Sequence, residues 1–140
     1  MGLCVLRNTN PNIQCYEICF PSERMAVPRV VQIRLAMMTI FAEQDVKDDV
    51  NTLVCIEGSS FGSRYRNTEL AEARITAAVY CLDNLQLTQN QFDFISTLKV
   101  RKLVFGSAKI RAEDTWKDMK PDAASSLAVA IAGLMLRQEK

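Results

Sequence analysis

The chain has 140 residues, of which 49% are hydrophobic and 24% charged, and its formal net charge is +1. These values are typical of a single globular domain, which we expect to span residues 1–140. The near-neutral charge excludes a surface that is basic or acidic throughout, so any electrostatic binding site has to be regional. The absence of histidine excludes Ser-His and Cys-His nucleophile systems and the commonest ligand of zinc.

The cysteines lie mostly in apolar stretches and form no C-x-x-C pair, so we interpret them as reduced packing residues in a reducing cytosol. There are five of them: Cys4, Cys15, Cys19, Cys55 and Cys81. The N-terminal stretch has no basic region followed by an apolar one, and the run from Leu127 to Leu136 is too short to span a bilayer. We therefore expect a cytoplasmic protein without a membrane partner.

The first half of the chain predicts a hairpin, a helix and a strand. "GLCVLR" and "IQCYEICF" are typical of strands, and the intervening "NTNPN" supplies turn residues. After Pro28, apolar side chains repeat at helical spacing as far as the acidic "EQDVKDD". The repeating positions are Val30, Ile33, Met37 and Ile40 or Phe41. The run from Leu53 to Ile56 then predicts a buried strand that ends on Glu57.

The second half predicts a helix, a short strand and further helices. After a loop through Arg66, Leu70, Ala73, Ala77 and Cys81 share one helix face, with Asn67 or Thr68 as the cap. "FDFI" indicates a strand. The stretch "LKVRKLVFGSAKIRAEDTWKDM" is compatible with either a strand or a helix at its start, and it is more helical after Ser107. The final "PDAASSLAVAIAGLML" predicts a helix that is apolar on nearly every face, and the order as a whole indicates a mixed α/β fold.

Glu57 and Asp122 are the candidate metal ligands. Ligands of α/β proteins gather at the carboxyl ends of central strands, where Glu57 is expected, and a final helix packed on the sheet would bring its first-turn Asp122 close by. Two neighbouring carboxylates repel each other unless one is protonated or a cation lies between them, and Mg²⁺ suits such a pair. The structural alternatives are helix capping by Asp122 and a loop-edge charge at Glu57.

Two segments combine positive charge with features suited to a nucleic acid. Every charge between Ile95 and Arg111 is positive, and the loop after Glu57 contains Arg64, Tyr65 and Arg66. Point charges bind phosphates and aromatic faces stack on bases, so we expect these segments to contact DNA. The candidates in the basic segment are Lys99, Lys102, Lys109 and Arg111. The structural alternative is an ordinary solvated face.

The order of these motifs resembles the RuvC family of Holliday junction resolvases, within the ribonuclease H-like superfamily. "GLCVLR" is similar to the first strand just after the family's Asp-x-Gly turn, and "VCIEGSSF" to the strand whose terminal Glu binds metal. "NTELAEARITAAVY" resembles the next helix, "LKVRKLVFGSAK" the Lys and Gly-Ser-Ala stretch, and "PDAASSLAVAIA" the closing Asp-Ala-Ala helix. The resemblance implies a ribonuclease H-like mixed sheet flanked by helices.

The resemblance also implies roles for individual residues. Glu57 and Asp122 match metal ligands, Phe61 an aromatic that contacts bases near the crossover, and Lys99 and Lys109 phosphate-binding lysines. The implied protein is a homodimeric, cytoplasmic crossover junction endodeoxyribonuclease that hydrolyses branched DNA with Mg²⁺, or with Mn²⁺ in its place.

Two of the four acidic residues that are usual in this family's metal site have no counterpart in this sequence. The family's first catalytic Asp lies just before the part that matches Gly2, and Ser125 stands where a second helix Asp is common. One bound ion in place of two is expected to slow cleavage by roughly a thousandfold or more. One alternative is that the sequence lacks the start of its first strand, which would supply the first Asp. A catalytically degenerate protein that only binds branched DNA is a second alternative. A nucleotide-binding protein using the glycines of "GSSFGS" is another, although this loop lacks the Gly-Lys-Ser/Thr ending of a P-loop.

Overall fold

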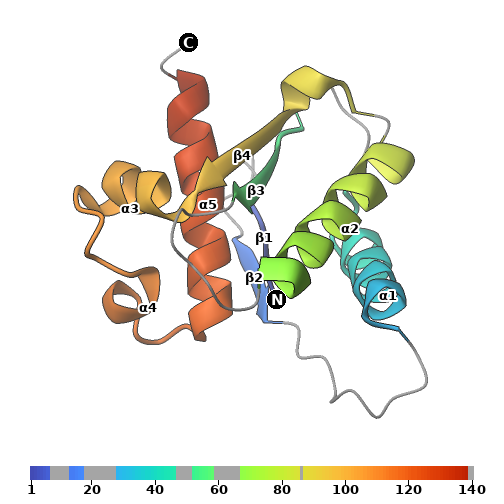
Figure 1. The fold of residues 1–140 in the computed structure, drawn as a ribbon, viewed down its shortest axis with the longest axis horizontal. Helices are drawn as coiled ribbons and strands as arrows, with labels where there is room; N and C mark the ends of the chain where they lie inside the picture. The colour runs from blue at the N-terminus through green and yellow to red at the C-terminus, as the bar shows by residue number, and fades with distance from the viewer. Residues whose placement is uncertain (7–12, 18–27, 47–51, 59–66, 86, 139–140) are drawn as a thin grey trace. The chain divides into compact units, whose positions relative to one another are not determined.

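The computed structural model describes residues 1–6, 13–17, 28–46, 52–58, 67–85 and 87–138; for Arg29 and residues 67–71 it describes the backbone alone. The chain divides into two units, one made of Met1–Cys19 and Ile95–Lys140 and the other of Phe20–Phe94. Figure 1 labels the elements of both units.

The first unit contains the predicted hairpin. Strands β1 (Gly2–Val5) and β2 (Gln14–Glu17) pair in antiparallel orientation, with Gly2 opposite Glu17 and Cys4 opposite Cys15. Directly paired residues project to the same face of a sheet, and so do residues two apart along a strand. These four residues therefore share one face of the hairpin. The expected turn residues lie outside the described ranges.

Helix α5 (Pro121–Gln138) forms the centre of the first unit, as the apolar final segment predicted. It packs against β1 and β2, and also against α3 (Thr97–Phe105) and α4 (Ala112–Thr115), which lie on the side away from the hairpin (Figure 1). Most of its buried residues are small, which allows backbones to approach closely. They are Ala123, Ala124, Leu127, Ala128, Val129, Ala132 and Gly133.

The stretch before α5 departs from its prediction. The regular helix precedes Ser107, whereas after Ser107 the chain forms only the four residues of α4. The reason is a cap at each end of α3. Ser96 accepts a hydrogen bond from the backbone N–H of Lys99 at 3.3 Å, and Gly106 ends the helix with a left-handed φ of 79°.

The second unit contains a pair of helices and the strand with Glu57. Helix α1 (Arg29–Glu43) buries Ile33, Met37 and Ile40, which confirms the predicted face, and it packs on α2 (Asn67–Leu85). The rings of Phe41 and Tyr80 meet edge to face between the two helices, with centroids 5.3 Å apart.

The strands of this unit form a separate small sheet. Strand β3 (Val54–Gly58) contains Glu57 and pairs with β4 (Phe92–Ser96), which follows the short 3₁₀ helix η1 (Gln89–Gln91). Helix α2 packs against β3. The predicted "FDFI" strand is thereby confirmed.

The described residues form two small sheets and five α-helices, so the mixed α/β class is confirmed. The ribonuclease H-like arrangement and the single domain stay predictions. Among the described residues, none of the helices combines the length and the apolar character needed to cross a membrane.

Candidate functional site

Asp122 lies in the first turn of α5, where the sequence predicted it. Its carboxylate is 55% exposed, and its Oδ2 atom is 3.4 Å from the ammonium group of Met1. The positive end of the helix dipole and the unpaired N–H groups of the first turn both favour a negative charge at this position. The carboxylate therefore lies on the surface with a cationic group beside it.

The start of β1 lies directly against this turn of α5. A Cβ atom on Gly2 would collide with the backbone carbonyl of Asp122 and would come within 3.2 Å of the Cβ of Ser126. Only glycine allows this approach, because the obstacle is backbone and has little freedom to move. The residue that precedes Gly2 is consequently placed next to the Asp122 carboxylate.

Glu17 brings a second acid to the same face of the hairpin. It is paired with Gly2, and Gly2 faces α5, so the Glu17 side chain projects toward α5 as well. Its Oε2 atom is buried and has no hydrogen-bond partner among the described residues. A buried carboxylate oxygen without a partner is costly. The sequence analysis did not single out Glu17, because its role depends on the pairing register.

Glu57 is half-buried on β3, near the carboxyl end of this strand, as predicted. It belongs to the second unit, whereas Asp122 belongs to the first. The expected convergence of these two carboxylates therefore stays a prediction.

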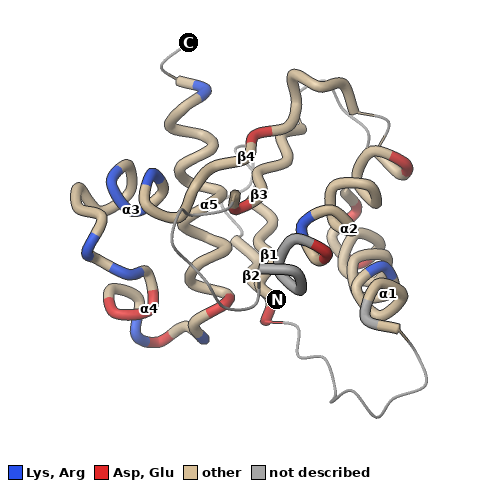
Figure 2. Tube along the Cα trace, viewed as in Figure 1, with Lys and Arg blue, Asp and Glu red and all other residues tan. Residues whose placement is uncertain are grey.

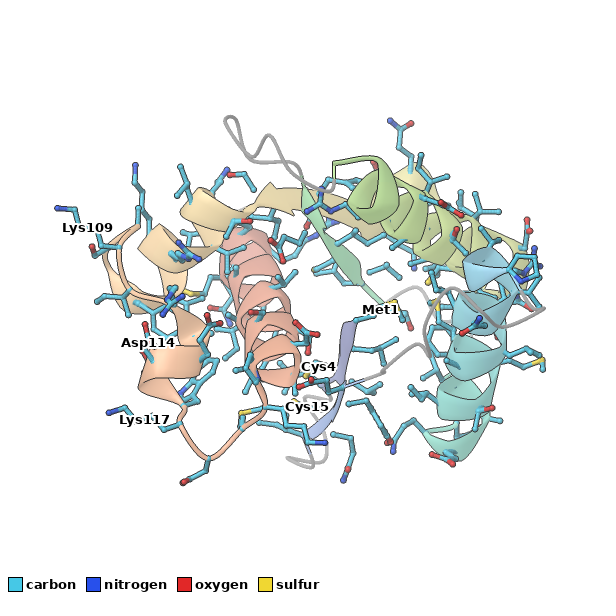
Figure 3. All side chains as sticks on the ribbon, turned by 60° about the horizontal axis from the view of Figure 1, so that its bottom comes forward. Met1, Cys4, Cys15, Lys109, Asp114 and Lys117 are labelled. Carbon is cyan, nitrogen blue, oxygen red and sulfur yellow. The ribbon has the colours of Figure 1, made fainter. Side chains whose placement is uncertain are left out.

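Three predicted DNA-binding lysines are exposed in the first unit. Lys99 and Lys102 are three residues apart on α3 and therefore lie on adjacent positions of one helix surface, while Lys109 lies in the turn that follows (Figure 2). Figure 3 shows Lys109 and Lys117 extending outward on the side of α3 and α4 that is away from the hairpin. Lys117 was not among the predicted residues, since it follows an acidic stretch.

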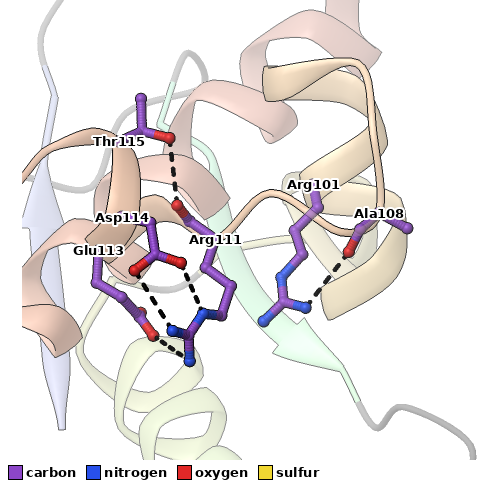
Figure 4. Close-up of polar contacts among 6 residues, drawn as sticks. All are labelled: Arg101, Ala108, Arg111, Glu113, Asp114 and Thr115. Atoms are coloured by element: carbon purple, nitrogen blue, oxygen red, sulfur yellow. Dashed lines mark hydrogen bonds and ion pairs between the residues drawn. The ribbon is translucent and has the colours of Figure 1, made fainter.

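Arg111 differs from these lysines because neighbouring acids hold it. Its guanidinium donates to both carboxylate oxygens of Asp114, at 2.9 and 3.3 Å, and lies 3.3 Å from Glu113 (Figure 4). The hydrogen bonds and charge of Asp114, with the charge of Glu113, raise the pKa of Arg111. Much of its charge is already neutralised, so it is a weaker phosphate ligand than Lys109. Glu113 and Asp114 are thus both engaged with Arg111.

The other predicted site residues lie outside the described ranges. They are Phe61, Arg64, Tyr65 and Arg66, all in the segment between β3 and α2. Their roles stay predictions.

The residues of the first unit suit a divalent cation in part. Carboxylate oxygens are the donors that Mg²⁺ prefers, and Asp122 is exposed next to a cationic group while Glu17 has an orphaned buried oxygen. Within the described ranges, however, no three acidic or cysteine side chains gather into a metal-binding group. One or two carboxylates completed by water and phosphate oxygens are the arrangement typical of magnesium.

Comparison with known proteins gave no match to a protein-family model, to a curated protein or to a solved structure.

Proposed function

We propose that this chain is a structure-selective endonuclease that hydrolyses branched DNA, such as a four-way junction, with Mg²⁺ or Mn²⁺. The observation that carries the proposal is the close contact between the start of β1 and the first turn of α5, which places residue 1 beside Asp122. The resemblance to RuvC-like resolvases implies that acids from these same two segments share a metal. Glu57 is the second proposed ligand, since it lies near the end of β3.

Glu57 and Asp122 would hold the metal in this proposal, with Glu17 as an additional carboxylate on the hairpin. The ion supplies Lewis-acid stabilisation of the charge that develops on the phosphate during hydrolysis. The chain's own residues bind and orient the substrate. Lys99, Lys102 and Lys109 are exposed point charges suited to the backbone phosphates on either side of the cut.

We also propose that two copies act together. A four-way junction has two-fold symmetry, and two equivalent cuts require two sites related by a dyad. Helix α2 exposes Ile75, Val79 and Leu82 at the spacing of a single helical stripe, and Ile75 is 63% exposed. Ile75→Glu is expected to lower the dimer fraction in sedimentation, whereas Leu35→Glu on the exposed side of α1 serves as the comparator. If neither variant changed the mass, the dimer would have to use another surface.

The function is tested with a labelled four-way junction and Mg²⁺, analysed on denaturing and native gels. We expect symmetric nicks that are lost in Glu57→Gln and Asp122→Asn and retained in Asp118→Asn, which neutralises an exposed carboxylate elsewhere in the first unit. Glu17→Gln tests the hairpin carboxylate in the same assay. A shifted junction without nicks would support the DNA-binding alternative that lacks chemistry. The absence of both nicks and shift would contradict the proposal.

A further inference from the structure

Cys4 and Cys15 form a closely spaced thiol pair on the hairpin. They are direct partners in the register of β1 and β2, and the thiol of Cys15 donates a hydrogen bond to Cys4 Sγ over 3.3 Å. Both side chains are half-buried, and Figure 3 labels both residues on the hairpin. Both are free thiols in this structure.

The geometry allows a covalent bond without a change of fold. Directly opposite residues of an antiparallel pair have Cα atoms about 4.5 to 5.5 Å apart, and disulfides form at about 4.4 to 6.8 Å. The two sulfur atoms have to approach by only about 1.3 Å to reach the usual bond length of about 2.0 Å. Rotation about the side-chain bonds supplies this movement.

We propose that Cys4 and Cys15 close a reversible cross-strand disulfide when the protein meets a peroxide. The thiolate of one cysteine attacks a peroxide oxygen, which gives a sulfenic acid and, with hydrogen peroxide, water. The second thiol then attacks the sulfenic sulfur and releases a second water. The overall change oxidises two thiols to one disulfide and reduces hydrogen peroxide to two molecules of water.

The two cysteines have different parts in this reaction. Burial and the neighbouring Cys15 raise the pKa of Cys4, so Cys4 remains a protonated thiol at neutral pH. Only a thiolate is an effective nucleophile toward a peroxide, so the protonated Cys4 is better suited to resolve the sulfenic intermediate than to attack the peroxide. The pair and its hydrogen bond are independent of the proposed nuclease activity.

The disulfide would fix the hairpin beside the first turn of α5. Gly2 precedes Cys4 on the same face of β1 and touches the backbone of Asp122. A bond between the strands removes freedom from the unfolded chain and resists separation of β1 from β2. We therefore expect the oxidised protein to have a higher melting temperature, and dithiothreitol to reverse the shift.

Peptide mapping of the 140-residue chain tests the pair directly. The reduced protein is treated with hydrogen peroxide, blocked with N-ethylmaleimide and digested with trypsin. Cleavage after Arg7 and Arg24 places Cys4 in one peptide and Cys15 with Cys19 in the next. The expected product is a cross-link between these peptides that persists in Cys19→Ser and disappears in Cys15→Ser.

Two controls keep the result unambiguous. Cys55→Ser removes a thiol of the other unit and should leave the cross-link unchanged, and circular dichroism checks that Cys15→Ser and Cys15→Ala are folded. A cross-link that persists without Cys15 would assign the reaction to Cys19 and overturn the proposal. Failure of the Cys19→Ser chain to form any cross-link, while its thiols remain open to N-ethylmaleimide, would overturn it as well.

Discussion

Ile33 and Leu35 occupy the same helix but opposite environments. Ile33 is 0% exposed in the packing between α1 and its neighbours, whereas Leu35 is 51% exposed. Removing a buried side chain loses its transfer free energy and leaves a cavity, so Ile33→Ala is expected to lower the free energy of unfolding by about 2 to 5 kcal/mol. Leu35→Ala should change it by less than about 0.5 kcal/mol. Urea denaturation followed by circular dichroism measures both, and equal losses would contradict the burial of Ile33.

Cys81 makes the free energy of unfolding depend on pH in the alkaline range. It is 3% exposed, and burial raises its pKa to about 12. The pKa of a cysteine in an unfolded chain is about 8.5. Between these values the unfolded chain releases a proton that the folded chain keeps. The contribution of Cys81 is therefore fully present below about pH 8.5 and is lost as the pH rises, by at most about 1.4 kcal/mol per pH unit.

The Cys81→Ala variant removes this contribution, together with the charge by which Cys81 raises the pKa of Tyr80. Burial also raises the pKa values of Cys4 and Tyr80, and both remain in the variant. We expect the free energy of unfolding of the variant to fall less steeply above pH 9 than that of the unmodified chain. Parallel curves in urea titrations at several pH values would show that Cys81 ionises as readily in the folded protein.

Among single residues, the sequence predicted those roles that depend only on neighbouring residues in the chain. The sequence places Asp122 at a helix start because proline followed by aspartate is a local signal, and α5 begins as expected. The proximity of Met1, Gly2 and Glu17 to that turn depends on how a hairpin packs on a helix more than one hundred residues away. No local pattern contains this information.

At the scale of the element, α3 depends on its two ends. Gly106 has a φ of 79°, and its N–H donates to the carbonyl of Lys102 at 3.0 Å. A Cβ atom added here would meet nothing within 4 Å, so Gly106→Ala carries a backbone cost alone, which we expect to be about 1 kcal/mol. Gly106→Asn should cost less, because asparagine tolerates the left-handed region better.

Trp116 provides the readout for this prediction. It is the single tryptophan of the chain, and its ring meets that of Phe105, next to Gly106, with centroids 5.3 Å apart. Denaturation followed by tryptophan fluorescence therefore reports on the end of α3. A Gly106→Ala protein as stable as the unmodified chain would show that the left-handed conformation does not persist in solution.

Helices and strands with regular patterns were predicted well, and the capped segment was not. The periodic apolar residues of α1 and the two strand segments of the hairpin are signals that extend over several residues. The helix α3 is nine residues long and contains several β-branched or aromatic residues, which favour strand as much as helix. The residues that define this helix are its N-cap Ser96 and its C-cap Gly106. Neither of them predicts a helix by itself, and only the two together mark its start and its end.

At the scale of the whole molecule, the class of fold follows from the order of elements, whereas the arrangement of the sheets does not. Alternating strands and helices predicted a mixed α/β protein, and the described residues form one. The two-stranded sheets β1-β2 and β3-β4 contain few strands for an independently stable sheet, so each depends on helix packing. Such long-range packing is not encoded in short patterns.

Binding to DNA is the property that tests the charge distribution of the whole chain. If about five phosphates are contacted, the logarithm of the binding constant should fall with the logarithm of salt concentration with a slope of about −4 to −5. Lys109→Gln removes an exposed charge and should reduce the magnitude of this slope by about 0.9. Arg111→Gln should reduce it less, because Asp114 and Glu113 already neutralise much of that charge.

Fluorescence anisotropy of a labelled four-way junction, titrated at several salt concentrations without metal, measures these slopes. Arg34→Gln removes one positive charge from α1, outside the basic segment, and should leave the slope unchanged. Equal effects of all three substitutions would mean that only net charge attracts the DNA. A slope near zero for the unmodified chain would remove the basic segment of α3 and its following turn from the proposed interface, because phosphate contacts necessarily release counterions.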